Sequence, residues 1–228
     1  MVRARKAAAP LSRDRILRAA VAVADSGGFD SLSMRSLASE LGTAPMSLYR
    51  HVANKEDLFD GMIDIVFSEV EFPSQGGDWL ATMRQRAISM HEALHRHPWA
   101  IGHMESRRRA GPANLRYHND TMACLREHAG FSFPVAVHAF SVMDSYIYGF
   151  AQQENALPSD IPAEAEVRRD AVVEADPDVA QLYPYLAQIP LELRKIDYDF
   201  SQEFQFGLDL ILDALERMRH REPASGKK

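Results

Sequence analysis

The segment His91-Glu92-Ala93-Leu94-His95 has the types and spacing of residues that could bind zinc. On a helix, the two histidines of an H-E-x-x-H pattern share one face and bind the metal, and the glutamate acts as a general base for hydrolysis. The pattern is short, the sequence supplies no assured third ligand, and the surrounding helix carries an apolar stripe typical of a helical bundle. We therefore interpret these histidines as surface residues. A helical metal-dependent enzyme stays as an alternative, but the sequence favours a protein with no catalytic residue, no resident metal and no cofactor.

Residues 33–55, SMRSLASELGTAPMSLYRHVANK, suggest another chemistry, which is recognition of DNA. Two short segments with apolar residues at helical spacing lie on either side of 41–43. In that turn, glycine ends one helix, and Thr43 followed by Pro45 begins the next. The outer face of the second helix could enter a major groove, and it carries Met46, Ser47 and Arg50. The pattern predicts a helix-turn-helix, although two small core helices joined by a glycine turn would look the same.

Neighbouring helices must hold this pair in place. A first helix is expected from Ser12, its N-cap, to Asp25, with Gly27 and Gly28 ending it. Asn54 is placed to cap a connecting helix over 55–71 that joins the small domain to the rest of the chain. Both helices have an apolar face to bury against the helix-turn-helix.

Two features near the expected groove favour contact with phosphates. Ser33 is placed to cap the second helix, whose exposed N–H groups suit an anion, and this puts Arg35 in the first turn. The first 11 residues read as a disordered arm in which Arg3, Arg5 and Lys6 could reach DNA. A solvated charged tail is the alternative for this arm.

The distribution of charge supports DNA binding by the N-terminal part. Residues 1–55 hold nine Lys and Arg and four Asp and Glu, a net charge of +5, whereas residues 56–228 hold seventeen and twenty-eight, a net charge of −11. Counterion release from DNA depends on the local surface, so the overall charge of −6 does not oppose binding by a basic end.

Composition excludes several other classes. A single cysteine, Cys124, rules out an intrachain disulfide and any multi-cysteine zinc site, and a buried apolar role is expected for it. The basic N-terminus lacks the apolar run of a signal sequence, and no segment has the roughly 18 uncharged apolar residues of a membrane helix. We expect a cytoplasmic protein.

From residue 78 onward the pattern is helical throughout, with helices expected at 78–96, 98–107, 112–129, 133–155, 164–188 and 196–221. Two of them, 133–155 and 196–221, are apolar on more than one side. One face suffices for a monomer core, so the surplus predicts a homodimer in which these helices from two copies form a four-helix interface. Two fully buried core helices would be the alternative. The interface residues we expect are Phe140, Ile147, Phe204, Leu208, Ile211 and Leu215.

The run from Ile16 to Phe59, ILRAAVAVADSGGFDSLSMRSLASELGTAPMSLYRHVANKEDLF, closely resembles the N-terminal domain of the TetR family of bacterial transcriptional regulators. The likeness lies in Leu-Ser-x-Arg-x-Leu-Ala-x-x-Leu-Gly, Leu-Tyr-x-His-Val and Asn-Lys-x-x-Leu. More loosely, the C-terminal part resembles the tetracycline-repressor-like subgroup through the helix at Trp79, His97-Pro98-Trp99 and 204–210.

The resemblance implies a homodimer whose reading helices enter successive major grooves of a near-palindromic operator, ~34 to 36 Å apart. Carried over by position, the base-reading residues are Arg35, Pro45, Met46 and Ser47. Phosphate contacts fall on Ser33, Thr43, Tyr49, His51 and Lys55. Tyr49 could instead be a core aromatic. Ala44 stands where the family often has serine, which leaves Thr43 as the expected cap of the reading helix.

The family also implies a small-molecule pocket in the larger domain. Candidate lining residues are apolar or weakly polar groups on converging helices, and core packing is the alternative for most of them: Met90, Trp99, His103, Met122, Met143, Tyr146 and Phe150. Arg86 and Met90 stand where a tetracycline site would need an amide and an aromatic ring. We therefore expect an apolar or aromatic effector other than tetracycline.

Together these observations predict an all-α protein with an N-terminal three-helix helix-turn-helix DNA-binding domain and a larger helical ligand-binding and dimerisation domain. The expected divisions are a basic arm at 1–11, the DNA-binding domain at 12–54 and the effector-binding and dimerisation domain at 55–228. The leading hypothesis is a repressor that a ligand releases from DNA. A DNA-binding protein without an effector is a further alternative.

Overall fold

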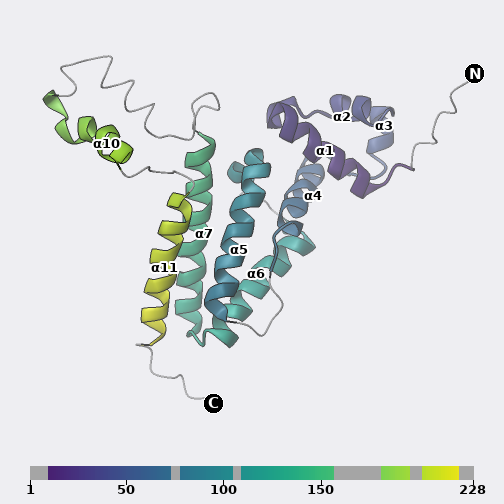
Figure 1. The fold of residues 1–228 in the computed structure, drawn as a ribbon. Helices are drawn as coiled ribbons and strands as arrows, with labels where there is room; N and C mark the ends of the chain where they lie inside the picture. Colours follow the sequence, from purple (N-terminus) through teal and green to yellow (C-terminus); the bar gives the residue numbers. More distant parts are fainter. Residues whose placement is uncertain (1–9, 73–77, 105–108, 157–180, 196–201, 221–228) are drawn as a thin grey trace, which may run out of the picture. The chain divides into compact units, whose positions relative to one another are not determined.

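The computed structural model describes residues 10–72, 78–104, 109–156, 181–195 and 202–220, and the regular structure in these ranges is helical (Figure 1). This confirms the all-α class. By internal contacts the chain divides into two compact units, residues 1–129 and 130–228. No helix in the described ranges is long and apolar enough to cross a membrane.

The first unit begins with the predicted helix-turn-helix. This part of the chain consists of α1 (Arg13–Gly27), a short 3-10 turn (Phe29–Ser31), α2 (Met34–Glu40) and α3 (Pro45–Leu48), and α2 and α3 are the two helices of the motif. Ser12 caps α1 and Ser33 caps α2, as predicted. The backbone turns after α1 at Gly28 and after α2 at Gly42, both of which have positive φ, where a side chain would be strained. The sequence therefore sets both turns.

One apolar cluster holds α1, α2, α3 and the start of α4 together. The apolar face expected on the first helix is buried, and it consists of Ile16, Leu17, Ala20, Val21 and Ala24 of α1. Leu37 of α2 and Leu48 of α3 are fully covered. Leu58 and Met62 of α4 belong to the same cluster. The predicted helix-turn-helix thus shares one apolar core with α1 and the start of α4.

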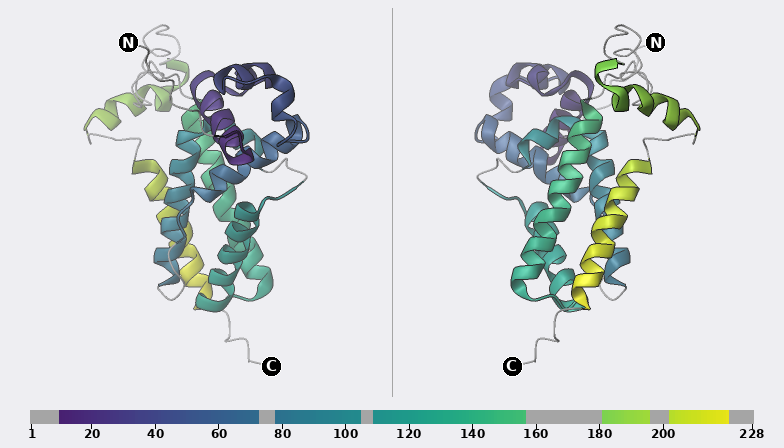
Figure 2. Two further views of the ribbon diagram at one scale, coloured as in Figure 1. Left: turned by 90° about the vertical axis from the view of Figure 1, so that its right-hand side faces the viewer. Right: turned by 90° about the vertical axis from the view of Figure 1, so that its left-hand side faces the viewer.

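The rest of this unit consists of α4 (Lys55–Ser68), α5 (Trp79–Arg96), a 3-10 helix (Pro98–His103), α6 (Pro112–Ala123) and a π-helical turn (Cys124–His128). Asn54 caps α4 as predicted. Helix α4 was predicted to end at 71 but ends at Ser68. The segment predicted as a helix over 98–107 is a 3-10 helix that ends at His103. Figure 2 shows α4, α5 and α6 from two further sides.

The second unit contains α7 (Phe133–Asn155), α10 (Pro184–Lys195) and α11 (Glu203–Arg219). Helices α7 and α11 lie side by side and antiparallel (Figure 1). The Tyr146 hydroxyl donates to the carbonyl oxygens of Glu203 and Phe204 at 3.1 and 3.0 Å, and burial raises the pKa of Tyr146 to about 12. A side chain at position 207 would collide with the Tyr146 ring, so Gly207 is required for this close approach.

The bounds of two expected helices differ. The final helix was predicted from 196 and is described from Glu203, and the predicted helix end at 188 lies inside α10, which begins at Pro184 and ends at Lys195. A proline, which has no N–H to satisfy, starts α10 at Pro184. Predictions on residues 1–9, 105–108, 157–180 and 196–201 lie outside the described residues, among them the arm and most of the segment 164–188.

Candidate nucleic-acid interface

The residues expected to read bases lie on the open side of the helix-turn-helix. Arg35, Pro45 and Met46 are exposed, and 74% of the Met46 surface is accessible. Ser47 is half-buried, and its neighbour Leu48 is fully covered. The buried Leu48 determines which face of the helix points outward. An apolar side chain with this degree of exposure on a basic surface suits contact with thymine methyl groups.

The N-cap of the reading helix lies one residue later in the chain than expected. Ala44 occupies the N-cap position, without a side-chain hydrogen bond, and Pro45 is the first helical residue. The prediction that Thr43 caps α3 is therefore wrong. Proline has no backbone N–H, so the first residue of this helix has no N–H group that needs an acceptor. Thr43 is half-buried in the turn.

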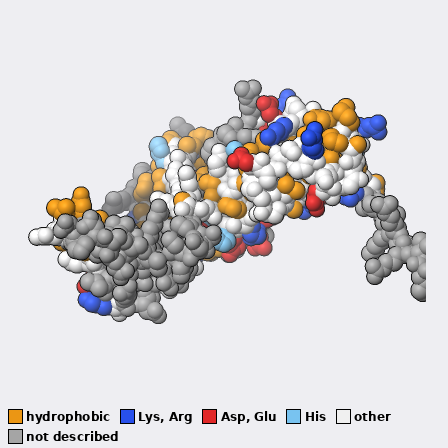
Figure 3. Space-filling view, turned by 90° about the horizontal axis from the view of Figure 1, so that it is seen from above, with side chains coloured by type: hydrophobic (Ala, Val, Ile, Leu, Met, Phe, Trp, Pro, Cys, Tyr) orange, Lys and Arg blue, Asp and Glu red, His pale blue; other side chains and the backbone are white. Residues whose placement is uncertain are grey.

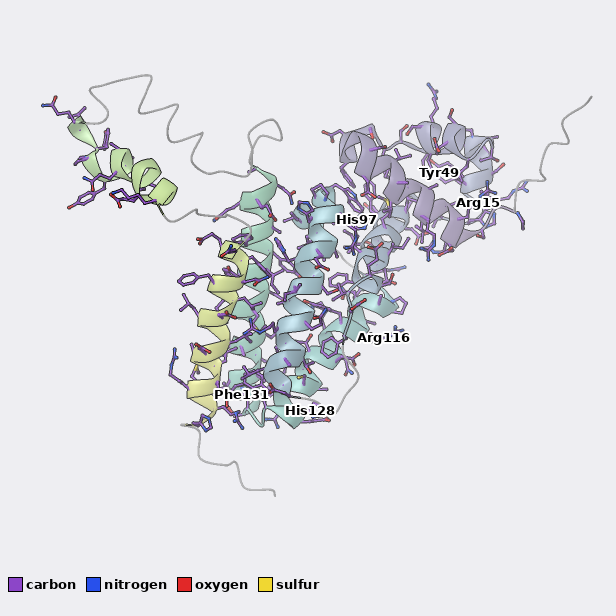
Figure 4. All side chains as sticks on the ribbon, viewed as in Figure 1. Arg15, Tyr49, His97, Arg116, His128 and Phe131 are labelled. Atoms are coloured by element: carbon purple, nitrogen blue, oxygen red, sulfur yellow. The ribbon has the colours of Figure 1, made fainter. Side chains whose placement is uncertain are left out.

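The residues assigned to phosphates are arranged around α2 and α3. Tyr49 is 44% exposed and so is not a core aromatic, and Figure 4 shows it on the helix-turn-helix. Ser33 accepts from the Ser36 N–H at 3.0 Å in a capping box, which orients the first turn of α2. Lys55 lies over the Phe59 ring at 5.1 Å from its centroid. The side chain of His51 is half-buried.

Basic side chains are spread over the N-terminal helices, with apolar side chains between them, when the molecule is seen from above (Figure 3). The exposed positions in this part of the chain include Arg18, Arg35, Arg50 and Lys55, and Arg15 is half-buried. They agree with the positive charge of residues 1–55.

An ion pair that the sequence did not reveal joins α1 to α4. Arg13 makes two hydrogen bonds to the Asp57 carboxylate, at 2.7 and 2.8 Å, and one to the carbonyl oxygen of His51 at 3.2 Å. Asp57 also accepts the N–H of Ala53 at 2.8 Å. The hydrogen bonds from Arg13 hold the pKa of Asp57 below its usual value. This clamp fixes the segment that follows α3 against both helices.

A second polar joint surrounds His97 at the end of α5 (Figure 4). Its Nδ1 lies 2.8 Å from Asp25 of α1, and its Nε2 lies 3.1 Å from Glu69, the residue that ends α4. Trp99 donates to the same Asp25 oxygen at 2.7 Å. Burial opposes ionisation of Glu69, but hydrogen bonds from Arg96 and His97 leave its pKa lowered. The ends of three helices are therefore held by one buried imidazole.

The candidate effector residues occupy several different environments. Met90 and Met143 are fully buried, and Met122 is half-buried on α6. Trp99 and His103 both contact Phe29, with ring centroids at 6.2 and 4.3 Å. In the second unit, Tyr146 and Phe150 pack on Phe204 at 5.5 and 5.3 Å. Their role as a pocket stays a prediction.

The expected dimer residues divide into two groups. Ile147, Phe204, Leu208 and Leu215 are buried, whereas Phe140 and Ile211 are half-buried. The exposed apolar side chains of α7 and α11 are different residues, and these are Phe133, Val137, Val142, Phe206, Leu210 and Met218. Hydrophobic spacing identified the two helices but not which of their faces is exposed, because both faces are apolar.

The H-E-x-x-H segment lies on α5, where His91 is half-buried and His95 exposed. Across the described residues, no group of three His, Cys, Asp or Glu is arranged to hold a metal ion. Cys124 is buried as expected, and burial raises the pKa of its thiol to about 11.

Comparisons with known proteins agree with this arrangement. Residues 16–62 match the family described as bacterial regulatory proteins, tetR family. Residues 72–219 match the tetracyclin repressor-like C-terminal domain. The chain belongs to the TetR family of transcriptional regulators. The resemblance expected closely over 16–59 and more loosely in the C-terminal part is therefore confirmed over both parts.

Three proteins show how similar the chain is to known members of the family in sequence and structure. The transcriptional repressor DrrR1 of Streptomyces coeruleorubidus is 35% identical over 90% of this chain and 77% of its own length. The class D tetracycline repressor of Escherichia coli is 28% identical over 91% of this chain and 90% of its own. Apo ActR of Streptomyces coelicolor superposes with a TM-score of 0.74 at 28% identity, covering 93% of this chain and 98% of ActR. ActR has also been crystallised with actinorhodin.

Membership of the TetR family gives the N-terminal helices their role. The helix-turn-helix of a DNA-binding transcriptional regulator is formed here by α2 and α3. These regulators form a family of transcription factors, and the comparisons support no enzymatic reading of the segment at His91 and His95.

Proposed function

We propose that this TetR-family regulator is a homodimeric repressor, that its two reading helices bind a near-palindromic operator, and that a small, largely apolar or aromatic effector releases it. The observation that carries the proposal is the exposure of Arg35, Pro45 and Met46 beside a fully buried Leu48. A helix held in this way presents one face to a major groove.

Within this proposal the side chains have separate tasks. Arg35 pairs with a guanine, while Pro45 and Met46 contact thymine methyl groups and Ser47 a base edge. Ser33, Thr43, Tyr49, His51 and Lys55 hold phosphates and fix the register. The DNA-binding domain occupies residues 12–54, preceded by the basic arm at 1–11, and residues 55–228 serve effector binding and dimerisation.

Dimerisation uses the exposed apolar side of α7 and α11. A groove of about 360 Å³ runs between these helices and is lined almost wholly by apolar side chains, including Val142, Leu210, Ile211 and Met218. Leu210 and Val142 are 55% and 51% exposed in the single chain. A second copy packed on this side would remove them from water by forming a four-helix interface. Phe140 and Ile211, which are half-buried, lie at its edge in this proposal.

The effector class follows from the composition of the helical body. Met90, Met122 and Met143 are adaptable apolar side chains, and Trp99, His103, Tyr146 and Phe150 are the aromatic candidates. ActR, which has a fold like this one, has been crystallised in complex with actinorhodin. A ligand releases the repressor only if it binds the DNA-free state more tightly than the DNA-bound state. No metal, cofactor or catalytic step is part of the proposal, and we place the protein in the cytoplasm.

A gel shift with the DNA upstream of the chain's own gene tests the proposal. The dimer should retard this fragment at moderate salt in excess unrelated DNA, and titration with actinorhodin, the ligand crystallised with ActR, should restore free DNA. Failure to bind at moderate salt would reject the proposed regulator. If the protein binds the DNA but actinorhodin does not release it, actinorhodin is rejected as an effector and the proposed DNA-binding function stands.

A further inference from the structure

The N-terminus of α6 has no cap of its own. Its N-cap residue is Gly111, without a side chain, and its first residue is Pro112, without an N–H. The next two N–H groups, of Ala113 and Asn114, both donate to Oδ1 of Asp64 at 2.9 Å. The following N–H, of Leu115, already bonds within the helix to Gly111. Asp64 belongs to α4, so a neighbouring helix supplies the whole cap.

The sequence at position 111 is fitted to this contact. A Cβ atom added to Gly111 would collide with the carboxylate carbon and Oδ1 of Asp64. Glycine therefore lets the carboxylate reach the helix end, where the positive end of the helix dipole also favours a negative charge. An ordinary capping residue at 111 would satisfy α6 locally but would push Asp64 away.

The same face of α4 carries the clamp to the DNA-binding helices. Asp57 precedes Asp64 by seven residues, which is two helical turns. Asp57 binds Arg13 of α1 and the N–H of Ala53, and Arg13 binds the carbonyl oxygen of His51 after the reading helix. Arg13, Asp57, Asp64 and Gly111 line one cavity of about 600 Å³. Two carboxylates on α4 thus hold α6 at one end, and at the other end α1 and the segment that follows the reading helix.

We propose that Asp64 is a positioning residue that couples the position of α6 to that of the DNA-reading helices, through its cap on Ala113 and Asn114. The inference rests on the proposed DNA-binding function. If α6 withdraws from α4, two N–H groups lose their acceptor, so the two helices cannot separate without a cost in free energy. Linkage requires that DNA binding, which fixes α4, also stabilises this cap.

Two variants separate the coupling from simple helix capping. Asp64→Ala removes the cap and the tether together. Asp64→Ala combined with Gly111→Asp supplies a cap from within α6 and leaves the tether broken. It removes the collision with the carboxylate, and the Cβ of residue 64, which would lie 2.7 Å from the added Cβ, must still shift. Asp78→Ala is the matched control, because Asp78 caps α5 from within that helix by accepting the N–H of Leu80 at 3.1 Å. Asp64→Asn keeps an acceptor oxygen and serves if the alanine variant does not fold.

Hydrogen exchange at the amides of Ala113 and Asn114, measured with and without the DNA upstream of the chain's own gene, is the readout. In the wild type, DNA should slow this exchange, and Asp64→Ala should speed it about fivefold in free protein, the effect of one lost cap. The double variant should recover slow exchange in the free protein yet show no response to DNA. Asp78→Ala should keep the response, and Asp64→Asn should show a reduced one.

The possible failures are distinguishable. If the wild type binds the DNA but exchange at these amides does not change, or if the double variant still responds to DNA, Asp64 is only a structural cap and the inference is overturned. A wild type that does not bind the DNA overturns the proposed function itself, and the inference with it.

Discussion

His97 Nδ1 lies 2.8 Å from Oδ1 of Asp25, although the two residues are 72 positions apart in the chain. The opposite ring nitrogen faces Glu69, and only 7% of the imidazole side chain is exposed. The imidazole therefore bridges two carboxylates, one from α1 and one from the end of α4.

Replacing His97 should destabilise the first unit. His97→Phe keeps a ring but removes both ring nitrogens, so Asp25 and Glu69 lose the hydrogen-bonding group between them, and we expect a loss of about 2 kcal/mol in the free energy of unfolding. Urea unfolding measures it. Adding Asp25→Asn to His97→Phe should recover part of the loss. Equal stability of wild type and His97→Phe would show that the joint contributes nothing.

The Arg13 and Asp57 clamp should make stability depend on acid. The folded pKa of Asp57 is lowered from its usual 3.8. Its stabilising contribution is therefore complete above pH about 3.8 and is lost as the pH falls through the lower folded value. Unfolding of wild type and Asp57→Asn should differ at neutral pH and converge in stronger acid. A difference that is constant across this range would contradict the assignment.

Reading residues and phosphate residues should respond differently to substitution. Arg35→Ala and Ser47→Ala should relax sequence preference, with ~1 to 3 kcal/mol lost for a bidentate contact at Arg35. Lys55→Ala should weaken binding to all sequences alike and make the salt dependence shallower. Titrations against the upstream fragment and base-substituted versions measure both effects. Uniform loss for all three variants would refute these separate roles.

A charge in the groove of α7 and α11 should separate the dimer. Leu210→Glu places a carboxylate on the exposed apolar side, and sedimentation should show a monomer with unchanged helical content. Leu115→Glu is the matched control, since Leu115 on α6 is similarly exposed at 59% but lies in the first unit. If the Leu210→Glu variant still sediments as a dimer, the interface does not lie in this groove.

The contact between α1 and α4 should not tolerate a methyl group. A Cβ at position 61 would lie 2.6 Å from Cδ2 of Leu17, so Gly61→Ala must displace α4 or Leu17. We expect a loss of about 1 to 3 kcal/mol, measured by thermal or urea unfolding. Gly102→Ala is the control, because an added Cβ there meets no atom within 4 Å.

Local rules predicted the elements well. The caps at Ser12, Ser33 and Asn54 and the glycine turn at residue 28 depend on neighbours in sequence, and the structure confirms them. The cap of α3 was mispredicted because proline, rather than threonine, sets that start. Helical periodicity also identified α7 over its full observed length.

The joints between helices could not be predicted in the same way. Asp64 and Ala113 are 49 residues apart, and His97 and Glu69 are 28 apart. A lone carboxylate on a helix has no sequence pattern that names its distant partner. The one available signal was Gly111-Pro112, a helix start with no capping side chain, which implied an acceptor from elsewhere.

The chain has two tryptophans, and the structure gives them different surroundings. Trp79 is buried at the start of α5, whereas Trp99 donates its indole N–H to Asp25 and stacks on Phe29. Any movement of α1 away from the end of α5 must change the polarity around one indole and leave the other as an internal reference. The intrinsic fluorescence of the protein therefore already contains a reporter of the region where the DNA-binding helices join the rest of the first unit.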